Sequence, residues 1–244
     1  MNKMKLATLK RNFLALLFLI SFTTLADETL CSKDYCDGFL VPNNIRNMIN
    51  DGYEKTTSAI IIGRKYLIAT TNSDINKCSI LFLITANGIN ENPVLPEKKP
   101  ICNYSVNKNN VISSWKDEGK WNEDIYQISN DKWTLIFRDA CVGCGMIKRT
   151  YFKEDVANET EILNDGSIYS ERTPLFGIVS VEKTTLLNSP IITDKKKSYL
   201  ITGDRFKLLD MSDNGLFYKI KYEIKSGKAL IAWITADDFS LDGK

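Results

Sequence analysis

Alternating hydrophobic and polar positions dominate the chain after residue 57 and predict β-strands. Residues 58–72, SAIIIGRKYLIATTN, form two apolar, β-branched runs on either side of Gly63, and CSILFLITANG follows at residues 78–88. The same pattern recurs in four later segments, at residues 110–115, 121–129, 132–141 and 146–152, with a turn at Asn130-Asp131. Short apolar runs bounded by turn residues are typical of antiparallel sheets. Between the first two groups, residues 89–102 contain three prolines and are expected to form a loop.

One segment before these runs has helical spacing instead. In VPNNIRNMIND, Asn43 or Asn44 is suited to cap a helix, and Ile45, Met48 and Ile49 fall on one helical face. The sequence therefore predicts one short helix.

The pattern divides the chain into two expected domains. Residues 27–165 are expected to form a β-rich, cysteine-containing domain with the short helix. A polar and turn-rich stretch covers residues 158–174, and we place the linker at residues 166–175. Residues 176–244 then form the second domain.

The second domain also shows strand periodicity. Tyr199 and Ile201, and then Phe206 and Leu208, alternate on either side of Gly203-Asp204 and predict one strand. Two further strands are expected, one at residues 217–224 after the MSDNG turn, the other at residues 229–234 after the KSGK turn. Short strands joined by tight turns over so few residues predict a small closed barrel, which has no exposed sheet edges.

The N-terminus has the layout of a secretory signal peptide. Residues 1–11 carry four basic side chains and no acidic one, residues 13–22 are apolar, and TTLA offers small residues for cleavage after Ala26. A ten-residue apolar core is too short to span about 30 Å of hydrocarbon as a helix. A lipoprotein is disfavoured because Glu28, Thr29 and Leu30 precede Cys31. We therefore expect residues 1–26 to be a signal peptide and the protein to be exported to the periplasm.

Removal of this segment changes the net charge. The chain has 32 basic and 30 acidic residues, and losing four basic ones leaves 28 against 30, a net charge of −2. Nucleic-acid binding loses its compositional support. No second long apolar run exists, so no membrane span is expected after cleavage.

Six cysteines precede residue 145, and an even count in an exported chain favours disulfides. Fifteen pairings are possible for six cysteines. Proximity along the chain favours three pairs, which are Cys31–Cys36, Cys78–Cys102 and Cys141–Cys144.

The spacing of Cys141 and Cys144, C-x-x-C, leaves alternatives open. A redox couple of the thioredoxin type would need a βαβ setting, whereas the flanks here have strand character. The chain has no histidine and no second C-x-x-C, which leaves only an all-cysteine zinc site. We expect a structural disulfide, no metal and no cofactor.

The absence of histidine also excludes Ser-His-Asp and Cys-His catalytic arrangements. Carboxylate pairs remain, such as Asp117 with Glu118 and Glu123 with Asp124. Adjacent carboxylates in a charged stretch are usually solvated, and a glycosidase pair needs a defined cleft. We therefore expect no catalytic residues.

Aromatic residues gather in the middle of the chain. Trp115 and Trp121 lie six residues apart, and Tyr126 and Trp133 follow. Exposed rings at this spacing can stack on sugars or peptides, whereas buried rings would fill the core of a small β domain. Trp115, Trp121 and Tyr126 are the candidate binding residues.

The C-terminal segment resembles the bacterial SH3-like family of exported and cell-wall proteins, over about residues 176–240. The resemblance rests on Tyr199-Leu200 with Gly203-Asp204, on Phe217, on Ile220 with Tyr222, on Trp233-Ile234 and on Asp237-Asp238-Phe239. The sequence departs from the family at Ala232, where glycine is usual, and at Phe217, where tryptophan is frequent. The resemblance implies an SH3-like barrel that binds cell-wall peptide, glycan or protein without catalysis. It assigns no ligand residue.

Three functions are compatible with these features. We expect an exported, non-catalytic binding protein, such as an inhibitor or immunity protein that blocks an exported toxin or cell-wall hydrolase. Its partner would be an exported protein or peptidoglycan. The alternatives are a cell-wall-acting enzyme with an SH3-like targeting module, and a C-x-x-C thiol-redox protein.

Overall fold

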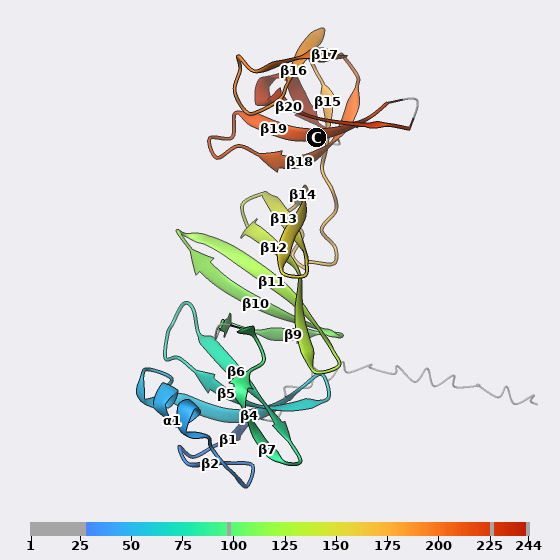
Figure 1. Ribbon diagram of the computed structural model, residues 1–244. Helices are drawn as coiled ribbons and strands as arrows, with labels where there is room; N and C mark the ends of the chain where they lie inside the picture. Colours follow the sequence, from blue (N-terminus) through green and yellow to red (C-terminus); the bar gives the residue numbers. More distant parts are fainter. Residues whose placement is uncertain (1–27, 97–98, 225–226, 243–244) are drawn as a thin grey trace, which may run out of the picture.

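The computed structural model describes residues 28–96, 99–224 and 227–242, and within them the protein is mainly β with one α-helix. Three large antiparallel sheets stack into an elongated molecule with a lower, a middle and an upper tier (Figure 1). The predicted fold class, mainly β with disulfides, is confirmed. The expected signal peptide, residues 1–26, lies outside the described residues.

The lower tier is a six-stranded sheet covered on one face by a helix. Its strands follow the order β1 (Thr29–Leu30), β4 (Lys55–Ile61), β5 (Arg64–Thr70), β6 (Cys78–Thr85) and β7 (Gly88–Pro93), with β8 (Ile101–Cys102) beside β6. The helix α1 (Asn43–Asn50) and the hairpin of β2 (Tyr35–Cys36) and β3 (Phe39–Leu40) complete the tier. Ile45 and Met48 of α1 pack against Leu67, Ile80 and Phe82 of the sheet, which confirms the expected helix and its apolar face.

The expected loop at residues 89–102 is wrong in part, because β7 and β8 lie within it. Gly88 adopts a φ of 130°, which turns the chain back along β6 so that Ile84 pairs with Ile89. Proline ends the strand at position 93, as expected for a residue that has no N–H to donate.

The middle tier is a six-stranded meander. Its strands are β9 (Ser105–Asn107), β10 (Asn110–Asp117), β11 (Lys120–Ser129), β12 (Lys132–Val142), β13 (Met146–Lys153) and β14 (Val156–Asn164), each paired with the next. Asn130 and Asp131 both have positive φ, 50° and 63°, and form the predicted turn. Residues 158–164, the first part of the polar and turn-rich stretch, lie in β14, so this stretch becomes a connecting segment only after Asn164. Glu161, Ile162 and Leu163 are consecutive and all buried there. Both faces of the strand are therefore covered, although the segment begins with polar residues.

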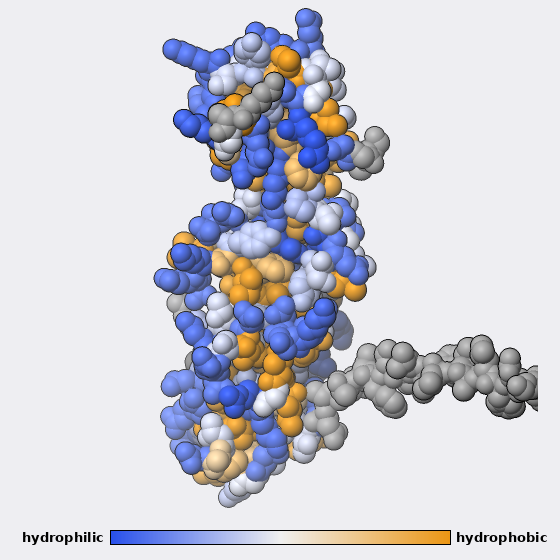
Figure 2. Space-filling model, turned by 90° about the vertical axis from the view of Figure 1, so that its right-hand side faces the viewer, coloured by the Kyte–Doolittle hydropathy of each residue, from blue (hydrophilic) through white to orange (hydrophobic). Residues whose placement is uncertain are grey.

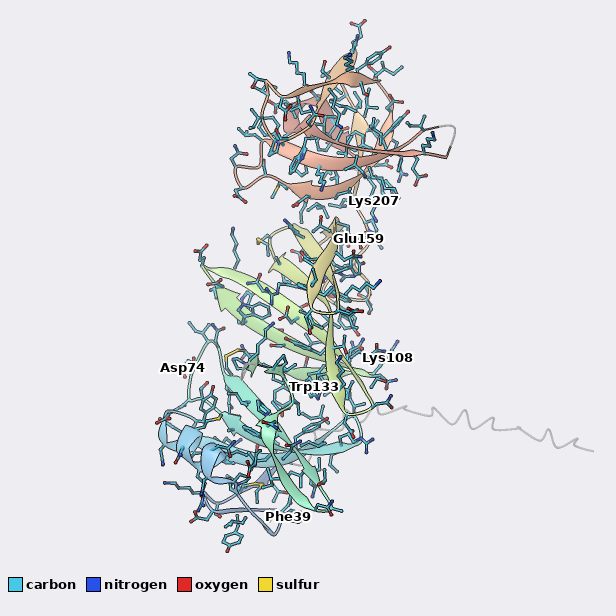
Figure 3. The ribbon with its side chains drawn as sticks, in the orientation of Figure 1. Phe39, Asp74, Lys108, Trp133, Glu159 and Lys207 are labelled. Carbon is cyan, nitrogen blue, oxygen red and sulfur yellow. A yellow bond between two sulfur atoms is a disulfide. The ribbon has the colours of Figure 1, made fainter. Side chains whose placement is uncertain are left out.

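The lower and middle tiers share one hydrophobic core, and hydrophobic residues also reach the surface along this part of the molecule (Figure 2). Tyr66, Ile68 and Leu81 of the lower sheet pack against Tyr126 and Trp133 of the middle sheet. The indole Nε1 of Trp133 donates a hydrogen bond of 3.3 Å to the Tyr66 hydroxyl, and the ring lies at the junction of the two tiers (Figure 3). Leu67 faces α1 while its neighbours face this core, because successive strand residues point to opposite sides.

The upper tier is a seven-stranded sheet wrapped around its own core. The strand order is β17 (Lys195–Ile201), β16 (Lys183–Leu187), β20 (Ala229–Thr235), β19 (Phe217–Glu223), β18 (Arg205–Met211), β15 (Phe176–Val179) and β21 (Phe239–Leu241), and the 3-10 turn η2 (Ala236–Asp238) precedes β21. The core includes Leu186, Leu200, Phe206, Ile220 and Ile234.

The single strand expected around Gly203 is wrong, because the structure has two strands there. The alternating residues from Tyr199 to Leu208 belong to β17 and β18, because Gly203 adopts a φ of 88° and turns the chain between them. β17 pairs with β16 and β18 pairs with β15 and β19, so the two strands lie in different parts of the sheet.

The middle and upper tiers are joined by more than the connecting chain. Ile162 of β14 belongs to the hydrophobic core of the upper tier. Leu175 donates a backbone hydrogen bond to the Ile162 carbonyl and accepts one from Leu208, at 2.8 and 3.0 Å. The ion pair of Lys148 with Asp210, 2.6 Å between Nζ and Oδ1, crosses the same junction.

Candidate functional site

A concave site lies at the junction of the middle and upper tiers. It is a groove of about 500 Å³ between the outer edge of β14 and the outward faces of β18, β19 and β20, and we call it the β14 groove. Glu159 and Lys207 mark its two sides in Figure 3.

One wall of the β14 groove is the edge of a sheet. β14 is the terminal strand of the middle tier, paired only with β13. Near its end, Leu163 bridges to Pro174 and Ile162 accepts the Leu175 N–H, which occupies that part of the edge. Residues 157–160 line the groove, and no strand among the described residues pairs with them on that side. The groove therefore contains a short open sheet edge.

The opposite wall is mainly basic, with three lysines and one acid, Asp210, which pairs with Lys148. Lys207 lies opposite Lys221 in the β18–β19 register, and Lys221 lies opposite Ile231 in the β19–β20 register, so the three side chains form a row across the sheet. Lys219 lines the groove one pair further along and forms no ion pair within the part of the chain that the structure describes. Lys221 approaches Glu223 only to 4.0 Å.

Glu161 connects the two walls. Its carboxylate accepts a hydrogen bond from the Tyr151 hydroxyl at 2.5 Å and pairs with Lys207 across the groove. Burial acts to raise the pKa of the Glu161 carboxyl, but the bonds from Lys207 and Tyr151 outweigh it and hold the pKa below its ordinary value of 4.5. Glu161 is therefore ionised at neutral pH and fixes the spacing of the walls.

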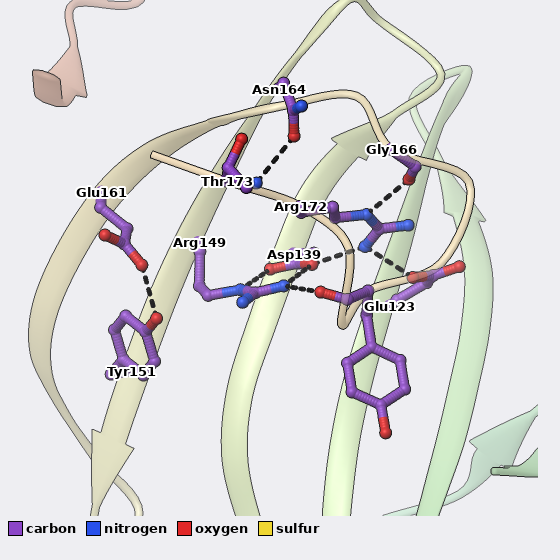
Figure 4. A network of polar contacts seen from close by, with 10 residues as sticks. Glu123, Asp139, Arg149, Tyr151, Glu161, Asn164, Gly166, Arg172 and Thr173 are labelled. Carbon is purple, nitrogen blue, oxygen red and sulfur yellow. Dashed lines mark hydrogen bonds and ion pairs between the residues drawn. The ribbon is translucent and has the colours of Figure 1, made fainter. Parts of the chain in front are cut away.

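Beside the groove, a buried charge network fastens the segment that joins the tiers to the middle sheet (Figure 4). Asp139 is fully buried and accepts two hydrogen bonds of 2.7 Å from the Arg149 guanidinium. Arg172, whose side chain has 0% exposure, pairs with both Asp139 and Glu123, at 2.5 and 2.8 Å. Two arginines thus neutralise two carboxylates.

The positions of this network follow from strand register. Asp139 of β12 lies directly opposite Arg149 of β13, so their side chains share one face of the sheet. Arg172 comes from the segment between the tiers, 33 residues from Asp139 and 49 from Glu123. Its carbonyl partner is Gly166, at 2.9 Å from Nε. The residue pattern does not indicate this long-range pairing, because it shows only an arginine in a polar stretch.

The two carboxylate pairs considered as catalytic dyads do not converge on one site. Glu123 and Asp124 are adjacent in β11, so their side chains point to opposite faces of the sheet. Glu123 pairs with Arg172, whereas Asp124 accepts two hydrogen bonds from Arg138 at 2.7 and 2.8 Å. Asp117 and Glu118 are exposed at the β10–β11 turn.

The three candidate binding rings are separated as well. Trp115 lies opposite Asn122, the neighbour of Trp121, so the two indoles lie on opposite faces of the β10–β11 hairpin. Trp115 is half-buried, with the Arg138 guanidinium 4.9 Å from its ring centre, and Trp121 is 39% exposed. Tyr126 is 2% exposed in the core. Tyr126 therefore packs in the core and presents no ring face at the surface, whereas Trp121 does.

The cysteines pair as proximity favours, in the disulfides Cys31–Cys36, Cys78–Cys102 and Cys141–Cys144. The C-x-x-C bridge closes the turn between β12 and β13. Asp165 accepts hydrogen bonds there from the N–H groups of Gly143 and Gly145, at 3.0 and 2.9 Å. The motif thus lies between two strands. Redox motifs usually lie at the start of a helix, where the pKa of the thiol is lowered.

The described residues show neither a metal site nor a membrane-spanning helix. Among residues 28–96, 99–224 and 227–242, no group of three Cys, Asp or Glu side chains is placed to hold a metal ion. In the same ranges we see no helix with the length and hydrophobicity that a membrane crossing requires.

Comparison of the chain with protein-family models, with curated proteins and with solved structures gives no match in any of the three.

Proposed function

We propose that this is an exported, non-catalytic binding protein that acts by occupying a partner, and that the β14 groove holds an extended segment of that partner. The partner class we favour is an exported protein, such as a toxin or a cell-wall hydrolase that the protein inhibits. The single observation that carries the proposal is the open edge at residues 157–160 facing a basic wall.

An open edge of this kind suits β-augmentation. An extended peptide gains affinity from main-chain hydrogen bonds to the edge strand, and its alternate side chains supply specificity. Here the alternate side chains of a bound strand would face Lys219, Lys221 and Ile231. A segment with acidic residues beside an aliphatic one would complement this wall.

The arrangement of carboxylates supports a role without catalysis. Asp139, Asp124 and Glu161 are buried, and each is held by an arginine or lysine. A general acid needs a raised pKa and a general base needs a free lone pair near the substrate. Carboxylates neutralised in this way serve neither role well, which disfavours the enzyme alternative.

Export and the SH3-like resemblance support the proposal from the sequence. Three disulfides suit an oxidising compartment, in line with the signal peptide expected at residues 1–26. The upper tier, with short antiparallel strands around a single core, is compatible with the binding module that the resemblance implies.

Site-specific photocrosslinking tests the groove directly. A photoreactive phenylalanine analogue at Asn158, on the open edge, should trap one exported protein from envelope extract, whereas the same analogue at exposed Asp74 should not. The purified partner should then bind the wild type, and Lys219→Glu with Lys221→Glu should weaken binding at least tenfold. Lys120→Glu with Lys132→Glu, which reverses two exposed charges elsewhere, is the matched control.

Two results would contradict the proposal. Equal trapping at Asn158 and Asp74 would show that the groove does not select a partner. Hydrolysis of purified peptidoglycan, abolished by changing one acidic residue without unfolding the protein, would establish the enzyme alternative instead.

A further inference from the structure

A second surface lies in the upper tier, on residues that do not line the β14 groove. The loop between β16 and β17 presents Ile191 and Ile192 to solvent, each 56% exposed. Two adjacent exposed isoleucines at a loop tip stabilise nothing within the folded chain. The upper tier, which carries this loop, lies at the end of the molecule opposite α1 (Figure 1).

The loop is held in shape by its own polar groups. Asp194 accepts hydrogen bonds from the Asn188 side-chain amide at 2.9 Å and from the Ser189 hydroxyl at 2.7 Å. The Asn188 N–H donates to the Asp194 carbonyl at 2.9 Å and the Asp194 N–H donates to the Ile191 carbonyl at 3.0 Å. The two isoleucines are therefore presented by an ordered loop, which lowers the conformational entropy lost on binding.

Lysines follow this apolar tip along the β16–β17 hairpin. Three consecutive lysines begin β17, and Lys195 and Lys197 are exposed on the same face of the strand as Tyr199. Lys183 lies at the end of the hairpin away from the loop, where it pairs with Ile201, and its Nζ is 4.0 Å from the Tyr199 ring centre. The nearest acids in sequence are Glu182 and Asp194, and Asp194 is engaged within the loop. We call Lys183, Ile191, Ile192, Lys195, Lys197 and Tyr199 the Ile191 surface.

We propose that the Ile191 surface docks the protein on a lipid bilayer that contains anionic phospholipid. Aliphatic side chains gain free energy by leaving water for the acyl boundary, and lysines near the bilayer are attracted to anionic headgroups. Tyrosine suits the interface because its ring is apolar and its hydroxyl is polar. The combination of an aliphatic tip, a basic strand face and one tyrosine suits an interfacial site better than a glycan site, because Tyr199 is the one aromatic ring of this surface and the Lys183 ammonium lies over its face.

Lysines on an edge strand have another use, which is to prevent sheet-to-sheet aggregation. β17 is an edge strand, and its lysines serve this end whatever else they do. Edge protection does not explain the exposed isoleucine pair, because apolar residues near an edge promote association. The isoleucines therefore carry the proposal, and the lysines supply its charge complementarity.

Vesicle flotation with the mature protein tests the proposal. The protein should float with vesicles of phosphatidylglycerol and phosphatidylcholine, bind phosphatidylcholine vesicles more weakly, and lose affinity as salt is raised. Ile191→Ser with Ile192→Ser should lower the partition coefficient about tenfold or more. Each of Lys195→Gln and Lys197→Gln should lower it about fivefold.

Matched variants and a soluble polyanion make the outcomes distinct. Leu216→Ser removes an apolar side chain that is 58% exposed on a different turn, and it should bind vesicles like the wild type. Unchanged melting temperatures exclude unfolding as a cause. Absence of binding to anionic vesicles, or full binding by the isoleucine variant, would overturn the proposal. Binding to polyphosphate as tight as to vesicles, lost only in the lysine variants, would show a polyanion site and would overturn it too.

Discussion

Replacing Arg172 with methionine should destabilise the protein, because this arginine fastens the segment between the tiers to the middle sheet. The substitution keeps most of the side-chain volume and removes the charge. It leaves Asp139 with Arg149 alone and leaves Glu123 without its partner. The network then changes from two charges of each sign to one positive and two negative charges.

The magnitude follows from what each carboxylate retains. Removing one partner of a buried ion pair typically costs about 3–5 kcal/mol. Asp139 keeps both of its bonds to Arg149, and Glu123, with a side chain 20% exposed, has some access to water. Arg172 Nη2 also lacks a hydrogen-bond partner within the described residues, which makes the native burial of this arginine less favourable. We therefore expect a loss of about 2–3 kcal/mol in the free energy of unfolding.

Urea unfolding followed by circular dichroism measures this loss, with two comparison variants. Asp139→Asn leaves two arginines without a shared carboxylate and should cost more than Arg172→Met. Arg64→Met breaks an ion pair with Asp131 whose side chains are 55% and 42% exposed, and it should cost less than about 1 kcal/mol. If Arg172→Met proves no more destabilising than Arg64→Met, the network does not fasten the segment and the reasoning is refuted.

Three other predictions concern the rest of the chain. The pKa of Glu161 is lowered in the folded protein, so its ion pair contributes its full stability at pH values above the ordinary pKa of 4.5. This contribution is lost as the pH falls through the pKa of the folded state. Melting temperatures of the wild type and Glu161→Gln should therefore differ at neutral pH and converge in acid. Gly177→Ala should cost about 3 kcal/mol in urea unfolding, since a Cβ there would lie 2.5 Å from the Phe206 ring, and a neutral result would contradict the packing described. Peptide mapping without reductant should find Cys141 and Cys144 bridged in protein from an oxidising compartment, and alkylation of both in the native protein would exclude a structural disulfide.

Local features of the fold could be predicted from the sequence. The turn at Asn130-Asp131 and the apolar face of the helix at Ile45 and Met48 depend on residues close together in the chain. The disulfide pairs likewise join cysteines that are near in sequence. In each case the residues whose interaction determines the local structure lie close together in the sequence.

Features that depend on distant partners could not be predicted. Residues 158–164 look like a linker because their polar side chains dominate, yet Ile162 completes the core of the upper tier and Glu161 meets Lys207. The candidate binding residues Trp115 and Trp121 lie on opposite faces because of the register between β10 and β11. The spacing of the residues along the sequence does not show this register. The open edge of β14 depends on which strands fail to pair with it, and only the assembled sheets determine that.

The placement of the disulfides has a mechanical consequence. Each bridge spans a short stretch within one tier, with sequence separations of 5, 24 and 3, and the upper tier contains no cysteine. A pulling force along the long axis is therefore carried between tiers by noncovalent contacts and a single peptide chain. When these contacts break, the largest disulfide loop, Cys78–Cys102, keeps only about 80 Å of chain from extending, at about 3.4 Å per residue. Held at its two ends, the molecule would lengthen in steps, with the upper tier as one unit and the lower and middle tiers, which share a core, as another.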